Sequence, residues 1–380
     1  MPATIVRRTA ASAAIAVVGA TAAFMGQPSA ASASAPVTEI TVSSPLAQPC
    51  NVQAAPDGSQ WFIEHGARRL GRIDLHTGVI VTVDLPNVTV VPHLPVAVQL
   101  PGAFPIGPCD MTVPGDGNLW FNDQYNNAVG YLSLRPPYVV HEIVLPTPYS
   151  VPMSMATGAD GNIYVTQTAS NQIAEINPQT HAVSEISVPT PVSGIIGGVA
   201  GQDGAHWFVE IAANKLLRLD YRTHAIREYT VPVPAALPFV VRSYGGQIWF
   251  TESGADAIGH FDPATGRFSA VSLPTPASVP IGVTRGVDGF LYTDESVGNK
   301  IARIDPVAMK VVAEYPVPTP GAFPDEMKTG PDGAIWAPEF LAGKLVRLWL
   351  PAFGTDPGVP PVSGATTLAQ DAARLLGVGP

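Results

Sequence analysis

The chain of 380 residues contains little charge and few signals for helix. Charged residues make up only 13% of it and hydrophobic residues 46%, a balance that excludes a disordered protein and indicates a sizeable core. The formal net charge is −10 with no basic stripe to offset it, so we expect no nucleic-acid partner. A nucleophile motif, a phosphate-binding loop and clustered histidines with metal-ligand spacing are also lacking. What the chain has in quantity is turn residues, with 40 prolines and 36 glycines.

The N-terminus has the pattern of a secretory signal. Arg7 and Arg8 precede an Ala-rich apolar segment and then a run of small residues. We predict a signal peptide over residues 1–33, because cleavage after Ala35 would place Pro36 beside the scissile bond; general and twin-arginine export both stay open. The apolar segment is short and rich in Ala and Gly, which argues against a retained anchor. We expect a secreted monomer without a membrane span, whose net charge becomes −12 because two arginines and no acids are lost.

An apolar strand built around an aromatic residue recurs seven times. The clearest copy is residues 246–276, which reads as strand, turn, strand, turn, strand and proline-rich exit. Successive aromatics are separated by 59, 44, 43, 42, 43 and 44 residues, so the period is about 43 residues with one insertion. The aromatics are Trp61, Trp120, Tyr164, Trp207, Trp249, Tyr292 and Trp336.

Each copy supplies the turns of a four-stranded sheet. An Asp-Gly pair, or Gly-Gly in the fifth copy, precedes each aromatic strand and provides the positive φ of a two-residue hairpin. The seventh copy lacks a fourth strand, but residues 37–42 (VTEITV) match residues 183–188 (VSEISV) almost one for one. We therefore predict an all-β fold over 37–350, a seven-bladed β-propeller of four-stranded blades whose last blade is closed by an N-terminal strand. Residues 351–380 are predicted to be a flexible, Pro/Gly-rich tail.

These blocks resemble the virginiamycin B lyase (streptogramin lyase) family. The resemblance rests on WFTE-like strands such as residues 249–252, the Asp-Gly turns, third strands of the N-x-I-G type and L-P-T-P exits, and it covers roughly residues 37–350. It implies a seven-bladed propeller that uses Mg²⁺ and opens an ester bond of cyclic depsipeptide antibiotics by elimination. In such enzymes histidines come directly after the strand-one proline, and a glutamate and a further histidine follow the strand-two aromatic.

The histidines that the resemblance requires are missing from this chain. The positions at the start of strand one hold Cys50, Cys109, Met153, Ile196, Phe239, Ile281 and Asp325. Three residues after the strand-two acids, where the further histidine would fall, the chain has only Ala, Asn, Ser and Gly. The resemblance therefore implies the fold and the acidic positions, but not the lyase mechanism.

Acidic residues at the ends of the second strands form the candidate site. The start of strand one and the end of strand two lie on the same face of a propeller, near its central channel, so we expect these acids around one mouth of the channel. They are Glu64, Asp123, Glu210, Glu252, Glu295 and Glu339. Two interpretations are open. The carboxylates bond to backbone amides and loops of adjoining blades, or Glu295, Asp325, Glu326 and Glu339 hold Mg²⁺ or Ca²⁺ as a cofactor.

Cys50 and Cys109 occupy the same position in consecutive blades, each directly after a proline. Because inner strands approach most closely at the channel, we predict a disulfide; a pair of small buried thiols is the alternative. The insertion at about residues 87–106 carries His93 and is either a flap over the mouth or a loop packed on its rim. His65 and His93 are the histidines expected to reach the mouth, and His65 with Glu64 forms the candidate catalytic base.

Three functions are open on the sequence. The first is an exported propeller that binds a small molecule, peptide or glycan at the channel mouth through Asp123, Glu210, Glu252 and His93, without lyase chemistry; the missing histidines favour it. The second is a metal-dependent lyase, or a lactone or ester hydrolase, that acts through the acidic positions with His65 or His93. The third is a cell-surface interaction module that uses the tail.

Overall fold

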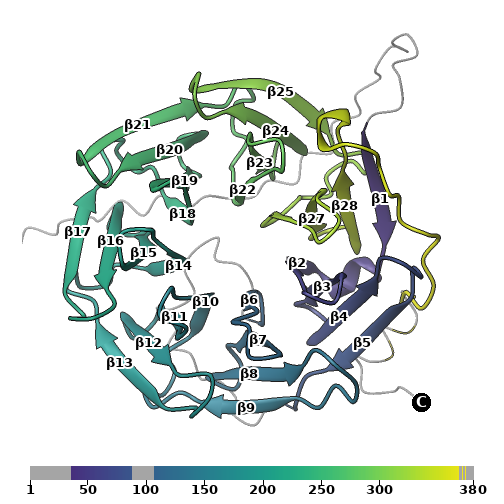
Figure 1. Ribbon diagram of the computed structural model, residues 1–380, viewed down its shortest axis with the longest axis horizontal. Helices are drawn as coiled ribbons and strands as arrows, with labels where there is room; N and C mark the ends of the chain where they lie inside the picture. The colour runs from purple at the N-terminus through teal and green to yellow at the C-terminus, as the bar shows by residue number, and fades with distance from the viewer. Residues whose placement is uncertain (1–35, 88–106, 368–369, 371–372, 374–380) are drawn as a thin grey trace, which may run out of the picture.

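The computed structural model describes residues 36–87, 107–367, 370 and 373. Their strands form seven four-stranded antiparallel sheets arranged in a ring around a central axis (Figure 1). The predicted all-β, seven-bladed propeller is confirmed. The predicted signal peptide and most of the insertion, including His93, lie outside the described residues.

The first four blades follow the chain, with the first strand of each beside the axis (Figure 1). Blades one and two contain β2 (Pro49–Ala54), β3 (Ser59–Glu64), β4 (Arg69–Asp74) and β5 (Ile80–Asp84), then β6 (Met111–Thr112), β7 (Asn118–Asp123), β8 (Ala128–Ser133) and β9 (His141–Val144). Blades three and four contain β10 (Pro152–Thr157), β11 (Ile163–Gln167), β12 (Gln172–Ile176) and β13 (Val183–Ser187), then β14 (Ile195–Ala200), β15 (Ala205–Glu210), β16 (Lys215–Asp220) and β17 (Ile226–Thr230).

The last three blades continue the ring, and the seventh takes its outer strand from the start of the chain. Blades five and six contain β18 (Pro238–Tyr244), β19 (Gln247–Glu252), β20 (Ala257–Asp262) and β21 (Arg267–Ser272), then β22 (Val283–Arg285), β23 (Leu291–Glu295), β24 (Lys300–Asp305) and β25 (Lys310–Pro316). Blade seven contains β26 (Lys328–Thr329), β27 (Ile335–Glu339), β28 (Lys344–Leu348) and β1 (Val37–Thr41). Two short 3-10 helices, η1 (Pro45–Ala47) and η3 (Pro351–Phe353), flank this closure.

The strand-two aromatics pack between blades. Six of the seven are fully buried, and Trp249 is 4% exposed. Trp207 of blade four, for example, shares a cluster with Ile248 and Phe250 of blade five. Burying rings of this size removes a large apolar area from water, so the repeated aromatic is explained by packing of one blade on the next.

The Asn that precedes the third strand anchors the segment that leaves the fourth strand of the same blade. In four blades it adopts a positive φ of 51–58°, which Asn tolerates better than most residues. In blade three, Asn171 Nδ2 donates to the carbonyl oxygens of Val188 and Thr190 at 3.1 and 2.9 Å, while its Oδ1 accepts from the Ser193 amide at 2.9 Å. The equivalent residues are Asn127, Asn214 and Asn299. This Asn therefore has a structural role.

The segment after β28 packs on blades seven and one, where a flexible tail was expected. Ser363 pairs with the start of β5: its carbonyl accepts from the Ile80 amide at 2.8 Å, and its amide donates to the Gly78 carbonyl at 3.0 Å. Val359 and Val362 pack against the cluster formed by β1, β4 and β28. Residues 351–367 thus cross the closure of the ring (Figure 1). Within the described part of the chain, no helix has the length and apolar character to cross a membrane.

Candidate functional site at the propeller axis

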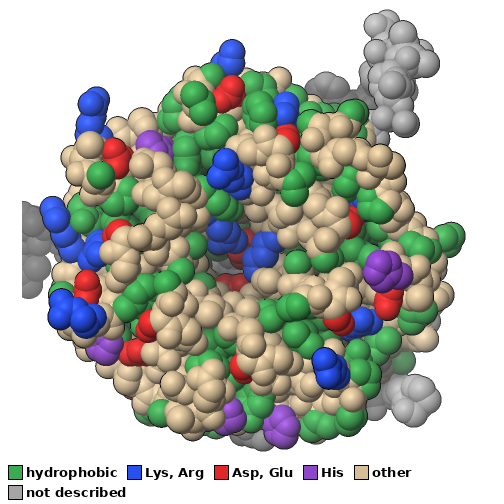
Figure 2. All heavy atoms as spheres, in the orientation of Figure 1, with side chains coloured by type: hydrophobic (Ala, Val, Ile, Leu, Met, Phe, Trp, Pro, Cys, Tyr) green, Lys and Arg blue, Asp and Glu red, His purple; other side chains and the backbone are tan. Residues whose placement is uncertain are grey.

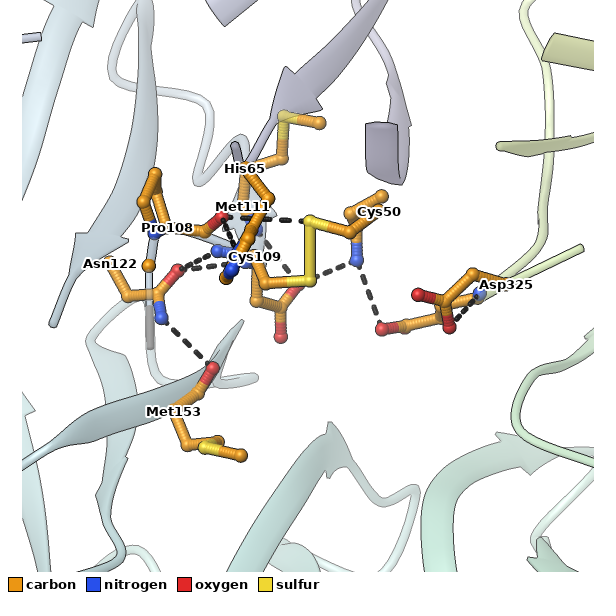
Figure 3. The surroundings of a disulfide bond; sticks show 12 residues. Cys50, His65, Pro108, Cys109, Met111, Asn122, Met153 and Asp325 are labelled. Carbon is orange, nitrogen blue, oxygen red and sulfur yellow. Dashed lines mark hydrogen bonds between the residues drawn. A yellow bond between two sulfur atoms is a disulfide. The ribbon is translucent and has the colours of Figure 1, made fainter. Parts of the chain in front are cut away.

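The Cys50–Cys109 disulfide joins the first two blades beside the axis (Figure 3). Cys50 lies on β2 and Cys109 just before β6, and their Cα atoms are 5.6 Å apart. The predicted disulfide is confirmed. Met153 and Asp325, which occupy the same position in blades three and seven, lie in the same neighbourhood (Figure 3).

His65 and Glu64, the candidate catalytic base, have different partners. The Glu64 carboxylate is buried and forms an ion pair with Arg69, which lies opposite it on β4. The His65 ring is buried, and its Nδ1 lies 3.2 Å from the Pro108 carbonyl oxygen. Burial lowers the pKa of His65 to about 4, so the ring is neutral near pH 7. The structure does not join these two side chains into one acid–base unit.

The strand-two acids lie inside the blades. All six side chains are buried. Asp123 accepts two hydrogen bonds from the Arg68 guanidinium, at 2.9 and 3.2 Å. Burial raises the pKa of Glu252 to about 7. These residues therefore do not line an open acidic mouth; their neighbours belong to the outer strands and turns.

In three blades the strand-two glutamate faces a second glutamate on the fourth strand. In blade four, burial and the Glu228 carboxylate raise the pKa of Glu210 to about 7. Glu228 keeps its charge because Lys215 Nζ lies 2.7 Å away and Thr190 donates to it at 2.7 Å. Blades six and seven repeat this arrangement. In blade six Glu295 faces Glu314, to which Lys300 and Thr275 donate. In blade seven Glu339 faces Glu39, to which Lys344 and Thr319 donate. Burial and the second glutamate raise the pKa of Glu295 to about 7 and that of Glu339 to about 8.

The four acids that were predicted to bind Mg²⁺ or Ca²⁺ have different neighbours. Glu295 and Glu339 lie in the lysine-containing clusters just described. Asp325 is buried, and burial followed by the nearby Asp294 carboxylate raises its pKa well above the usual range. Glu326 forms an ion pair with Arg242. With lysine or arginine next to three of the four acids, this donor set does not fit the Mg²⁺ centre that the resemblance implies.

A charged network inside the channel was not predicted. It lines a cavity of about 300 Å³ that is also bounded by other residues at the inner edges of the blades. Lys328 Nζ donates to Asn51 and Gln53 side chains at 3.0 and 3.1 Å and lies 3.7 Å from Asp110. Burial and the Glu326 carboxylate raise the pKa of Asp110 to about 6. Basic and acidic side chains gather in the hollow at the centre of the ring (Figure 2). The sequence signal was a single basic residue in an otherwise uncharged first strand, as at Arg242 on β18 and Lys328 on β26.

The closed ring of seven blades defines a seven-bladed β-propeller, and a charged cavity lies on its axis. The sequence model of the Virginiamycin B lyase family matches residues 96–265 and 240–352. The chain belongs to this family.

Solved structures agree with this assignment. The chain is 25% identical to a catalytically inactive virginiamycin B lyase variant from Staphylococcus aureus solved with quinupristin, with a TM-score of 0.72; the match covers 83% of this chain and 99% of that one. A streptogramin B lyase structure is 27% identical, with a TM-score of 0.72 and coverage of 82% and 96%. The extracellular domain of a putative hybrid two-component system from B. thetaiotaomicron, 11% identical over 79% of this chain and 40% of that one with a TM-score of 0.58, shares the fold alone. No curated protein sequence matches the chain significantly.

Proposed function

We propose that this protein is a secreted member of the family that binds a small molecule, peptide or glycan in its channel, without lyase chemistry. The observation that carries the proposal is the axial cavity of about 300 Å³, lined by Arg242, Glu326, Lys328 and Asp110 together with residues of the first strands. Concave sites with a few converging polar groups are where propeller-sized domains take small ligands. The positions where the resemblance requires histidine hold Cys, Met, Ile, Phe and Asp.

Ligand binding is tested by thermal shift with a panel of quinupristin, short peptides and oligosaccharides. A ligand at a hundredfold excess over its dissociation constant stabilises the folded state by about 2.7 kcal/mol. Lys328→Met should reduce that shift, because it removes one of the two cations that line the cavity while keeping a side chain of similar length. Arg285→Met, at an exposed position on β22, is the matched control. Equal shifts in both variants would place the ligand elsewhere.

Family membership favours a second candidate, a metal-dependent lyase or a lactone or ester hydrolase. It is tested by incubating the protein with quinupristin and Mg²⁺ and following ring opening by mass spectrometry. We expect the ring to stay intact, because no histidine stands at the strand-one positions. Linear product that depends on Mg²⁺ and on the protein concentration would replace the first proposal with this one.

Secretion is supported by the disulfide, since oxidising compartments preserve such bonds. N-terminal sequencing of protein exported by a bacterial host should begin at Ser34. Intact residues 1–33 on the exported protein would contradict the proposed cleavage.

A further inference from the structure

Three potential metal ligands converge beside the disulfide. One imidazole nitrogen of His65 and the two sulfur atoms of Cys50 and Cys109 all lie within 4.8 Å of one another. Among the described residues, this is the only group of three or more Cys, His, Asp or Glu side chains brought so close. The three residues come from blade one and the start of blade two, on the side of the axis drawn in Figure 3.

A backbone carbonyl contacts one nitrogen of the His65 ring, and the other nitrogen has no hydrogen-bond partner among the described residues. A proton on Nδ1 would be donated to the Pro108 carbonyl oxygen at 3.2 Å, which leaves the lone pair of Nε2 free. Nε2 is buried and has no hydrogen-bond partner among the described residues, in a side chain that is 4% exposed. Metal-binding histidines commonly donate their second nitrogen to a backbone carbonyl in this way. A buried acceptor without a hydrogen-bond partner is costly in the absence of a ligand.

Cysteine sulfur and imidazole nitrogen are the donors that zinc prefers, and three protein ligands leave a fourth position for water. The disulfide has to be reduced first: a thiol or phosphine reductant supplies two electrons, the sulfur–sulfur bond breaks, and each sulfur takes up a proton. Zinc then replaces these two protons, which pass to solvent. Tetrahedral Zn–S bonds of about 2.3 Å need the sulfurs roughly 3.8 Å apart, which side-chain rotation can provide.

We propose that Cys50, His65 and Cys109 bind one zinc ion when their disulfide is reduced. The disulfide and the zinc site use the same sulfur atoms, so the two states exclude each other. This inference is independent of ligand binding in the channel, and either can fail without the other.

The test compares oxidised and reduced protein without oxygen. Protein reduced with a phosphine and then desalted is titrated with Zn²⁺ by calorimetry, and with Co²⁺ by absorption, which reports thiolate ligands and tetrahedral geometry. We expect one ion per reduced chain and none per oxidised chain. A reduced chain that binds no stoichiometric ion, or an oxidised chain that binds equally, would overturn the proposal.

The role of His65 is tested with His65→Gln, which keeps both thiols. We expect the zinc affinity of the reduced variant to fall by at least about tenfold, since even indirect partners of a metal ligand are worth 10–100-fold. His224→Gln, at a half-exposed histidine of the outer edge, should leave the affinity unchanged. Melting curves and thiol counts establish that each variant is folded and reduced. Equal affinity in His65→Gln and wild type would remove His65 from the site.

Discussion

Lys344 on β28 lies 2.6 Å from the Glu39 carboxylate on β1, although 305 residues separate them in the sequence. Thr319 donates to the same carboxylate at 2.8 Å. Blade four makes the same cluster from its own strands, with Glu228 on its fourth strand in the place of Glu39. The N-terminal strand therefore replaces a fourth strand in its side-chain contacts as well as in its backbone pairing.

Deleting residues 36–43 should open blade seven. The deletion removes five antiparallel pairs between β1 and β28 and three buried aliphatic side chains, Val37, Ile40 and Val42. Because each large buried aliphatic residue contributes about 2 kcal/mol or more, we expect the free energy of unfolding to fall by more than about 4 kcal/mol. Denaturant unfolding of chains that begin at residues 34 and 44 measures this. Thr41→Ala, at an exposed position of β1, is the control. Two chains of equal stability would contradict closure by this strand.

Stability should fall as the pH rises through about 8, because of Glu339. Its pKa is about 8 in the folded protein, against 4.5 as its ordinary value. The folded state therefore holds a proton that the unfolded state has released, and this contribution is complete below pH 4.5 and lost as the pH rises through 8. Glu339→Gln should remove that dependence. Between pH 5 and 9 we expect wild type to lose at least about 1.4 kcal/mol, the equivalent of one pKa unit, more than the variant.

Blade three provides the matched reverse variant. Gln167 stands where the other blades have acids, and its Nε2 donates to Glu185 at 2.7 Å. Gln167→Glu should therefore introduce a new loss of stability at high pH, in the opposite sense to Glu339→Gln. Urea unfolding at pH 5, 7 and 9 follows both variants. If neither variant changes the slope of stability against pH, the buried glutamates are not protonated at neutral pH.

The fold could be predicted because its signals are local and repeated. Each signal depends on a short segment: the Asp-Gly turns, the period of the aromatics, and the match of residues 37–42 to a fourth strand. Together these signals predicted a closed ring. The disulfide followed from the equivalent positions of Cys50 and Cys109 in that ring.

The site could be predicted less well, because it depends on side-chain direction. The strand-two acids stand at the ends of their strands, on the face of the propeller where we expected them. Their side chains, however, contact residues of the outer strands and turns. A lysine five residues after Glu210, Glu295 and Glu339 was the visible sign of this. Of the channel charges, Glu326 was among the acids named from the sequence. Asp110 and Arg242 are far from it in the sequence, and only the closed ring brings them and Lys328 to the same cavity.

Trp249→Ala should destabilise the fold by roughly 3–5 kcal/mol, because a buried ring between blades five and six would leave a cavity. Trp249 also lies 4.4 Å, between ring centroids, from His260. Val307→Ala, at a side chain that is 92% exposed, should change stability by no more than about 0.5 kcal/mol. The denaturant midpoints of the two variants are compared, provided that the unfolding free energy depends on denaturant concentration with the same slope in both. A Trp249→Ala protein as stable as wild type would mean that this ring does not contribute to blade packing.

The segment after β28 should stabilise the closure of the ring. A chain that stops at Leu350 loses the Arg347–Asp356 ion pair at 2.6 Å, the two backbone hydrogen bonds of Ser363 and the apolar contacts of Val359 and Val362. At about 1 kcal/mol for each buried hydrogen bond, we expect a loss of at least about 2 kcal/mol against a chain that stops at Thr367. Asp356→Asn alone should cost less, because a half-exposed ion pair contributes little. If the two truncated chains unfold at the same denaturant concentration, this segment contacts the blades without stabilising them. The closure of the ring would then depend on β1 alone.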